Sequence, residues 1–185
     1  MQKIEIFDIP GVKLIPYSKF FDERGYFCKI LDKEILLDMD LSFEYNSIAL
    51  SSNDHAGTIR GLHFQSEPFA EEKIIACLYG RIFDVAVDLR SGSPTFRKWG
   101  SITLSSDEPR IIFLPKGVAH GFQTLEKNSV LLYALSAPYN QESAHTLSYA
   151  DSDLNIKWPL TISNISKKDV AGISLGSAID LSNRV

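Results

Sequence analysis

The chain has 185 residues, of which 44% are hydrophobic and 23% charged, and its net charge at pH 7 is −4. These values are typical of a globular protein with one substantial core, since a chain of this length buries about 70% of its unfolded surface. They argue against a nucleic-acid partner and a membrane span, because no basic run exceeds two residues and no apolar run approaches the ~20 residues that cross a bilayer.

Short alternating segments separated by turn residues fill the middle of the chain. The stretches SGSP, SSDEP, LPKG and EKN have turn compositions, and strands spaced by about 8–12 residues are typical of an all-β sandwich or barrel. In chain order, the sequence predicts a helix at 32–38, strands at 57–65, 73–79, 82–89, 110–114 and 129–135, and a helix start at 166–169. We therefore expect a single all-β domain over residues 1–185, with short helices only at its flanks.

Several of these strands carry polar or ionisable side chains among apolar ones. His63 and Gln65 are two residues apart in GTIRGLHFQ (57–65), so they share a strand face. Lys73 opens the next strand, Tyr133 lies in a later one, and His120 follows a tight turn. In a small barrel such residues can line a ligand pocket.

Each of these residues also fits a purely structural role. A lone histidine in a half-buried strand is often a hydrogen-bonded core residue, Tyr133 can fill a barrel interior, and Lys73 can be a solvated strand start. The spacing Ser166-Lys-Lys-Asp169 is a helix-capping pattern. By themselves the residues leave these alternatives open.

The glycines and histidines resemble those of metal-binding cupins, which carry two histidines one residue apart, then a glutamate, then a histidine in a PxGxxH segment. The chain has His63 and the segment PKGVAH at 115–120. However, Gln65 replaces the second histidine and Lys73 replaces the glutamate, and a protonated ammonium has no lone pair for a cation. We therefore predict no bound metal.

A more specific resemblance covers almost the whole chain. The chain resembles the dTDP-4-dehydrorhamnose 3,5-epimerases and their close relatives in FDERGY (21–26), GTIRGLHFQ, EEKIIACLYGRIFDVAVDLRSGSPTFRKW (71–99), FLPKGVAHGFQTL (113–125) and LNIKWP (154–159). The resemblance implies a cupin jelly-roll barrel, a homodimer, no metal or organic cofactor, and a nucleotide-linked 4-keto-6-deoxyhexose as substrate.

The resemblance also implies catalytic roles that make chemical sense. A 4-keto group acidifies the hydrogens at C3 and C5, so epimerisation needs a base, stabilisation of the enolate and a proton donor on the opposite face. By resemblance, His63 is the base and Asp169 holds its imidazole in one tautomer. Lys73 counters the enolate charge, and Tyr133 is the opposite-face proton donor.

Basic side chains would hold the sugar and the diphosphate. The resemblance assigns this role to Arg24, Arg60, His120 and Lys168, and a bidentate arginine suits phosphate oxygens. Asp84 and Tyr139 are predicted to support these residues.

Some positions depart from the pattern usual in that family. Lys29 and Ala144 stand where glutamates are usual, although Glu142 is near enough to compensate, and Ala134 stands where a lysine is usual. Residues 48–50 read Ile-Ala-Leu in place of Gln-Asp-Asn. Since a buried polar contact contributes about 1 kcal/mol, we expect a relaxed or altered nucleotide preference, such as a CDP- or GDP-linked deoxysugar.

Other functions stay open at this point. The same acid–base residues can serve C3, C5 or both, a related cupin can be a 3,4-ketoisomerase, and a cupin without catalysis can be a sugar-nucleotide-binding module. The N-terminal MQKIEIFDIP carries acidic residues where a secretory signal would be apolar. Cys28 and Cys77 fit neither a CxxC pair nor a zinc pattern, so we expect reduced thiols and a cytoplasmic protein.

Overall fold

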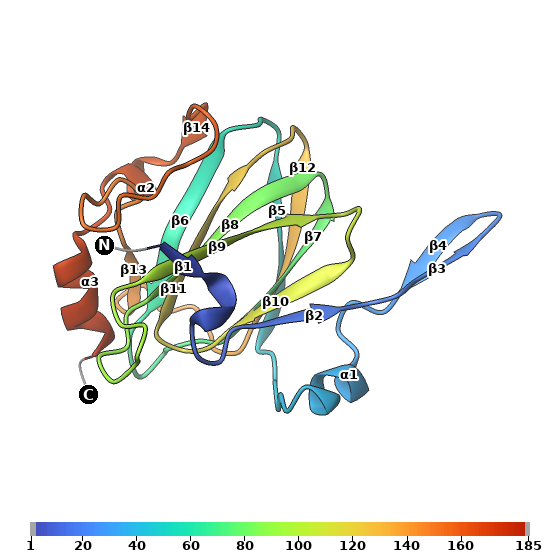
Figure 1. Ribbon diagram of the computed structural model, residues 1–185, viewed down its shortest axis with the longest axis horizontal. Helices are drawn as coiled ribbons and strands as arrows, with labels where there is room; N and C mark the ends of the chain where they lie inside the picture. Colours follow the sequence, from blue (N-terminus) through green and yellow to red (C-terminus); the bar gives the residue numbers. More distant parts are fainter. Residues whose placement is uncertain (1–2, 184–185) are drawn as a thin grey trace.

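The computed structural model describes residues 3–183, in which two β-sheets face each other as a jelly-roll barrel with short flanking helices (Figure 1). The first sheet has the order β1-β9-β8-β11-β6-β13, with β14 beside β6, and its strands are β1 (Lys3–Glu5), β6 (Thr58–Gln65), β8 (Arg81–Asp88), β9 (Trp99–Ser105), β11 (Val118–Thr124), β13 (Ala144–Thr146) and β14 (Asn164–Ile165). The second has the order β2-β10-β7-β12-β5, and its strands are β2 (Lys13–Pro16), β5 (Ser47–Asn53), β7 (Lys73–Tyr79), β10 (Arg110–Leu114) and β12 (Ser129–Leu135). The predicted all-β cupin class is confirmed.

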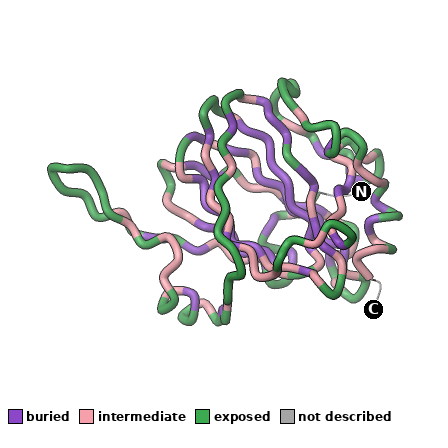
Figure 2. The backbone as a smooth tube through the Cα atoms, turned by 180° about the vertical axis from the view of Figure 1, so that it is seen from behind, coloured by how far each residue is buried: buried purple, intermediate pink, exposed green. Residues whose placement is uncertain are grey.

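A separate two-stranded hairpin projects from the barrel. It consists of β3 (Lys19–Asp22) and β4 (Gly25–Cys28), and we call it the arm. Figures 1 and 2 show the arm extending away from both sheets, with an exposed tip.

The helices lie at the flanks, as the sequence predicts. The 3-10 turn η1 spans Ile6–Asp8, and the helices are α1 (Lys33–Asp38), α2 (Lys167–Val170) and α3 (Leu175–Ser182). The N-cap residue of α1 is Asp32, whose carboxylate accepts a hydrogen bond from the Glu34 amide at 3.1 Å. The sequence analysis did not predict η1, α3 or the strands β1 to β5, β9, β11, β13 and β14.

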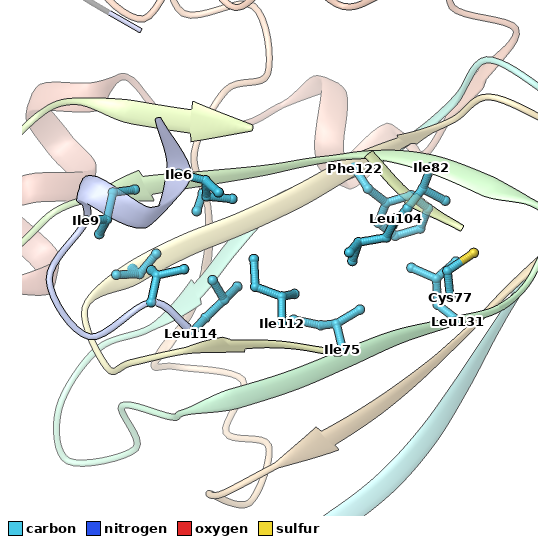
Figure 3. Packing of buried hydrophobic residues seen from close by; sticks show 13 residues of the cluster. Ile6, Ile9, Ile75, Cys77, Ile82, Leu104, Ile112, Leu114, Phe122 and Leu131 are labelled. Atoms are coloured by element: carbon cyan, nitrogen blue, oxygen red, sulfur yellow. The ribbon is translucent and has the colours of Figure 1, made fainter. Parts of the chain in front are cut away.

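Apolar side chains from both sheets meet inside the barrel. On β7 the alternation directs Ile75 and Cys77 between the sheets, where they pack against Leu131 of β12 and Phe122 of β11 (Figure 3). Burying one such side chain contributes about 1.5–3 kcal/mol. Lys73 has the same parity as Ile75 and Cys77, so the interior face of β7 changes from apolar to charged at the start of the strand.

The outer faces of the sheets are covered too. Leu175 and Ala178 of α3 pack on Val85 and Val87 of β8, while α1 covers part of the second sheet through Leu36. Because both faces of β8 are covered, its interior-facing Asp84 is fully buried.

A β-bulge in β6 brings two residues of odd spacing to one face. His63 pairs with His120, but Arg60 pairs with Phe122, so β6 has one residue more than β11 between these pairs. Gly61 lies in this bulge with φ of +106°, and a Cβ there would lie 2.6 Å from the carbonyl oxygen of His120. Arg60 and His63, three residues apart, therefore face the same side.

Candidate active site

A cavity of about 330 Å³ lies in the barrel interior between the sheets. The first sheet contributes Arg60, His63 and His120 to its wall, and the second contributes Lys73 and Tyr133. Tyr139 and Lys168 complete the predicted residues that line it. The structure thus brings together seven of the ten side chains singled out in the sequence.

Asp169 lies behind His63 and hydrogen-bonds to it. His63 Nε2 lies 2.6 Å from Asp169 Oδ1, and the Asp169 side chain is only 5% exposed whereas that of His63 is 42% exposed. Because an ionised carboxylate only accepts hydrogen bonds, this contact holds a proton on Nε2 and leaves the other ring nitrogen with its lone pair. Ser166 Oγ accepts from the Asp169 amide at 3.0 Å, so the serine caps α2 and the carboxylate is available to His63.

The surroundings of Asp169 favour its ionised form. Burial acts to raise the pKa of this carboxyl, but the hydrogen bond and charge of His63, followed by hydrogen bonds from Ser166 and the Gly61 backbone, outweigh it and lower the pKa. Asp169 is therefore a carboxylate at neutral pH.

Lys73 is a buried cation at the edge of the cavity. Its ammonium donates to the His63 carbonyl oxygen at 3.0 Å and lies 3.3 Å from Glu71 Oε1. Burial lowers the pKa of Lys73, and the Glu71 carboxylate opposes that shift through its charge and its hydrogen bond.

Tyr133 faces the cavity from β12, where it pairs with Ala49 of β5. Its ring makes an edge contact with the His120 ring, with centroids 5.9 Å apart. Burial raises the pKa of the Tyr133 phenol well above its usual value, the Asp84 carboxylate raises it further, and Arg60 opposes both. The phenol therefore keeps its proton at neutral pH, as a proton donor must.

His120 and Asp84 form a second buried pair. His120 Nε2 lies 2.8 Å from Asp84 Oδ2, and both side chains are almost wholly buried. Asp84 contacts His120 and does not line the cavity, and within residues 3–183 its Oδ1 has no hydrogen-bond partner. Asp84 therefore orients the His120 ring from behind.

Basic side chains converge on the cavity despite the acidic balance of the chain. Arg60 Nε donates to Asn53 Oδ1 at 2.7 Å, which fixes the guanidinium at the cavity wall. The Lys168 ammonium lies 6.0 Å from the centroid of the Tyr139 ring. With Lys73 these residues place three cations around the cavity, a suitable environment for an anionic ligand.

Arg24 lies apart from the other predicted residues. It occupies the turn of the arm, pairs with Asp22 at 2.5 Å, and its side chain is 86% exposed. The structure does not bring Arg24 to the cavity of its own chain, because the arm points away from the barrel (Figure 1).

The departures noted in the sequence differ in their relation to the cavity. Ala49, Leu50 and Ala144 line it, so this part of the wall is apolar. Glu142 is exposed and outside the cavity wall, so the expectation that it compensates for Ala144 is wrong for this chain. Lys29 pairs with Asp32 at 3.2 Å, beside α1.

Sequence analysis overlooked Glu71 and His145, which also line the cavity. Glu71 precedes Lys73 by two residues but lies before the start of β7, so the alternation of side chains along a strand could not have placed it. His145 lies on the short strand β13, whose pairing with β6 has no local sequence signal.

Within residues 3–183 there is no group of three or more His, Cys, Asp or Glu side chains that could hold a metal ion. No helix in that range is long and apolar enough to cross a membrane.

The fold and the cavity define a cupin-type jelly roll with an acid–base site between its sheets. A family model described as dTDP-4-dehydrorhamnose 3,5-epimerase matches residues 7–177. The chain is 42% identical over 170 residues to the dTDP-4-dehydrorhamnose 3,5-epimerase of Sinorhizobium fredii, an alignment that covers 90% of this chain and 86% of the relative. The chain belongs to the dTDP-4-dehydrorhamnose 3,5-epimerase family and is an epimerase, an enzyme of the isomerase class.

Solved structures agree with this assignment. The crystal structure of the Bacillus anthracis dTDP-4-dehydrorhamnose 3,5-epimerase with TDP and PPi bound is similar with a TM-score of 0.85 at 37% identity, and the match covers 89% of this chain and 94% of that one. The Legionella pneumophila epimerase in complex with dTDP-4-keto-L-rhamnose is similar with a TM-score of 0.83 at 34% identity, covering 89% and 88%.

Proposed function

We propose that the protein epimerises a nucleotide-linked 4-keto-6-deoxyhexose at C3 and C5, the conversion of dTDP-4-keto-6-deoxyglucose to dTDP-4-keto-rhamnose. The observation that carries the proposal is that His63 and Tyr133 line one cavity from opposite sheets. A substrate ring held between the sheets would meet a base on one face and a phenol on the other, which is the arrangement that inversion requires.

The proposed reaction follows from these positions. The lone pair of His63 takes the proton from the carbon beside the keto group, and Asp169 stabilises the imidazolium that results. The electron pair moves to the keto oxygen, where the ammonium of the buried Lys73 stabilises the enolate. Tyr133 then protonates the same carbon from the opposite face, which inverts the centre.

The cations Arg60 and Lys168 would bind the diphosphate, and His120, oriented by Asp84, would contact the sugar. The ligands named for the Bacillus anthracis and Legionella pneumophila relatives, TDP and dTDP-4-keto-L-rhamnose, support a dTDP sugar as substrate. Since Ala49, Leu50 and Ala144 line the cavity, CDP- and GDP-linked sugars are the necessary comparison substrates.

Proton NMR in D₂O tests the reaction. Incubation of dTDP-4-keto-6-deoxyglucose with the protein is expected to remove both the C3 and C5 proton signals and to give the rhamno product. Loss of one signal alone would contradict the double epimerisation. His63→Ala is expected to abolish exchange while much of the dTDP affinity is retained, and a wild-type protein that binds dTDP but exchanges no ring proton would instead be a binding module.

We propose further that residues 1–185 form one domain that works as a homodimer in the cytoplasm. Four aromatic side chains on the arm are exposed, namely Phe20, Phe21, Tyr26 and Phe27, and an exposed apolar surface of this kind is typical of an interface. The free cysteines fit a reducing compartment.

If the arm contacts a second copy, the exposed Arg24 would lie near that copy and could bind the substrate held in its cavity. Light scattering is expected to show a dimer for the wild type and a monomer for Phe21→Ser with Phe27→Ser. A monomeric wild type would contradict the dimer.

A further inference from the structure

Glu71 is a largely buried carboxylate of the cavity wall that the proposed reaction does not use. Its side chain is 10% exposed, and its Oε1 lies 3.3 Å from the Lys73 ammonium, which is 7% exposed. A carboxylate in this position is unexpected beside the site of an enolate, because its negative charge opposes the one that develops in the reaction. A buried charge of this kind requires a partner, and Lys73 is that partner.

The hydrogen bonds of Lys73 determine its orientation. An ammonium has three N–H donors. One points to the His63 carbonyl oxygen at 3.0 Å and a second to Glu71. These contacts leave one donor for a ligand in the cavity, since no other acceptor for Lys73 is found within residues 3–183.

Glu71 is itself held in place by Gln65. The Gln65 side-chain amide donates to Glu71 Oε2 at 3.3 Å and to the carbonyl oxygens of Phe69 and Pro138 at 3.0 and 3.2 Å. The side-chain oxygen of Gln65, Oε1, accepts a hydrogen bond from the Asn140 backbone amide at 2.8 Å. The carboxylate is thus fixed between two loops and the start of β7, so Lys73 meets it in a defined position.

The contact with Glu71 affects the protonation state of Lys73. Burial drives Lys73 towards its neutral form, and Glu71 is the group whose charge and hydrogen bond oppose that tendency. The other titratable groups that line the cavity are Arg60, His63, His120, Tyr133, Tyr139, His145 and Lys168. None of these is an acid that carries negative charge at neutral pH, so Glu71 is the carboxylate of the wall that can hold the ammonium.

We propose that Glu71 is a positioning residue of the active site, whose carboxylate keeps Lys73 in its charged form and directs the remaining N–H donor of Lys73 into the cavity. This inference rests on the proposed function, because the donor is useful only where a negative oxygen develops. The negative charge of Glu71 partly cancels the positive charge of Lys73. The same contact keeps the Lys73 ammonium protonated at a desolvated position.

An NMR titration tests the proposal without any substrate. Protein labelled with ¹³C at lysine Cε gives a signal for Lys73 that is assigned by its loss in Lys73→Arg. The titration midpoint of Lys73 is expected to fall by about one to three pH units in Glu71→Gln, the range that one adjacent opposite charge produces. Glu72→Gln, which makes the same change outside the cavity wall, is the matched control and is expected to leave the midpoint in place.

Kinetics supply the second readout. In Glu71→Gln the alkaline limb of the kcat/KM–pH profile, which reports the ionisations of the free enzyme, is expected to move to lower pH by the same interval as the NMR midpoint, while kcat/KM on the acid side is retained or raised. Glu71→Asp keeps the charge and is expected to restore most of the wild-type profile. A uniform fall of kcat/KM at every pH, or an Asp variant that titrates like the Gln variant, would overturn the proposal.

The two readouts separate this inference from the reaction itself. An unchanged Lys73 midpoint in Glu71→Gln contradicts the role of Glu71, whatever the wild type turns over. A shifted midpoint in a protein that exchanges no ring proton contradicts the proposed epimerisation and leaves the charge coupling of Glu71 and Lys73 in place.

Discussion

Replacing Asp169 by asparagine isolates the contribution of its charge to His63. The substitution keeps the size of the side chain, which is 5% exposed and lies 2.6 Å from His63 Nε2. The asparagine side chain is neutral and carries an NH₂ donor, so it neither stabilises an imidazolium nor holds one tautomer. We therefore expect a loss in kcat with little change in dTDP affinity.

The magnitude follows from the geometry of the pair. Two unit charges about 4 Å apart attract by about 4 kcal/mol at an effective dielectric constant of 20. Because the His63 side chain is 42% exposed, screening by water reduces this figure, and we take about 2–4 kcal/mol. Since 1.36 kcal/mol corresponds to a tenfold change in rate, kcat is expected to fall about 30- to 900-fold.

The assay is the rate of deuterium incorporation at C3 and C5, followed by NMR with saturating substrate. Ser166→Ala is the control, because it removes the cap of the same helix and one hydrogen bond to Asp169 but keeps the charge of the carboxylate. This control is expected to cost about 1 kcal/mol of stability and to change kcat only a few-fold. Equal losses of kcat in the two variants would refute the reasoning, since displacement of the helix would then explain both.

The acid dependence of stability provides an independent check. The pKa of Asp169 is lowered in the folded protein, so its carboxylate stabilises the fold above the unfolded value of about 3.9. This contribution is lost as the pH falls through the lowered folded value. In urea titrations the wild type is therefore expected to exceed Asp169→Asn in stability at neutral pH, and the difference is expected to close in the acid range. A difference that stays constant down to the acid range would show that the charge is not involved.

Three other substitutions test the phenol, the bulge and the core. Tyr133→Phe keeps the ring but removes the proton donor, so NMR is expected to show deuterium exchange without inversion; inversion at the wild-type rate would exclude this phenol as the donor. Gly61→Ala places a Cβ 2.6 Å from a carbonyl oxygen at φ of +106°. This variant is expected to lower the free energy of unfolding by about 1–3 kcal/mol and to reduce kcat. In the control Gly92→Ala the added Cβ meets no atom within 4 Å, so neither change is expected. Ile112→Ala removes a fully buried side chain from the core and is expected to cost about 2–5 kcal/mol by urea denaturation, against less than 0.5 kcal/mol for the exposed Leu37→Ala.

Local patterns in the sequence were sufficient for much of the fold. The strands at 73–79, 110–114 and 129–135 have the predicted bounds, because alternation of apolar side chains and the flanking turn residues act over a few positions. The same local signals show the cap of α1 at Asp32. The family also follows from the sequence, since long ordered segments such as 71–99 are similar to known epimerases.

Other features depend on contacts between distant segments. No local pattern predicts that Arg60 and His63 share a face, because three residues separate them and only the bulge opposite β11 turns both inwards. The pairing of His63 with Asp169 joins residues 106 positions apart, and the capping pattern at Ser166 could not distinguish that contact from an ordinary helix start.

The sequence by itself determined the all-β class, the positions of β6, β7, β8, β10 and β12 along the chain, and the identity of the reactive side chains. Tertiary structure decided which of them meet: His63 and Tyr133 come from opposite sheets onto one cavity, while Arg24 lies on an arm outside it. The physical reason is that periodicity and turn chemistry act within a strand, whereas a catalytic site requires the packing of strands that are far apart in the chain.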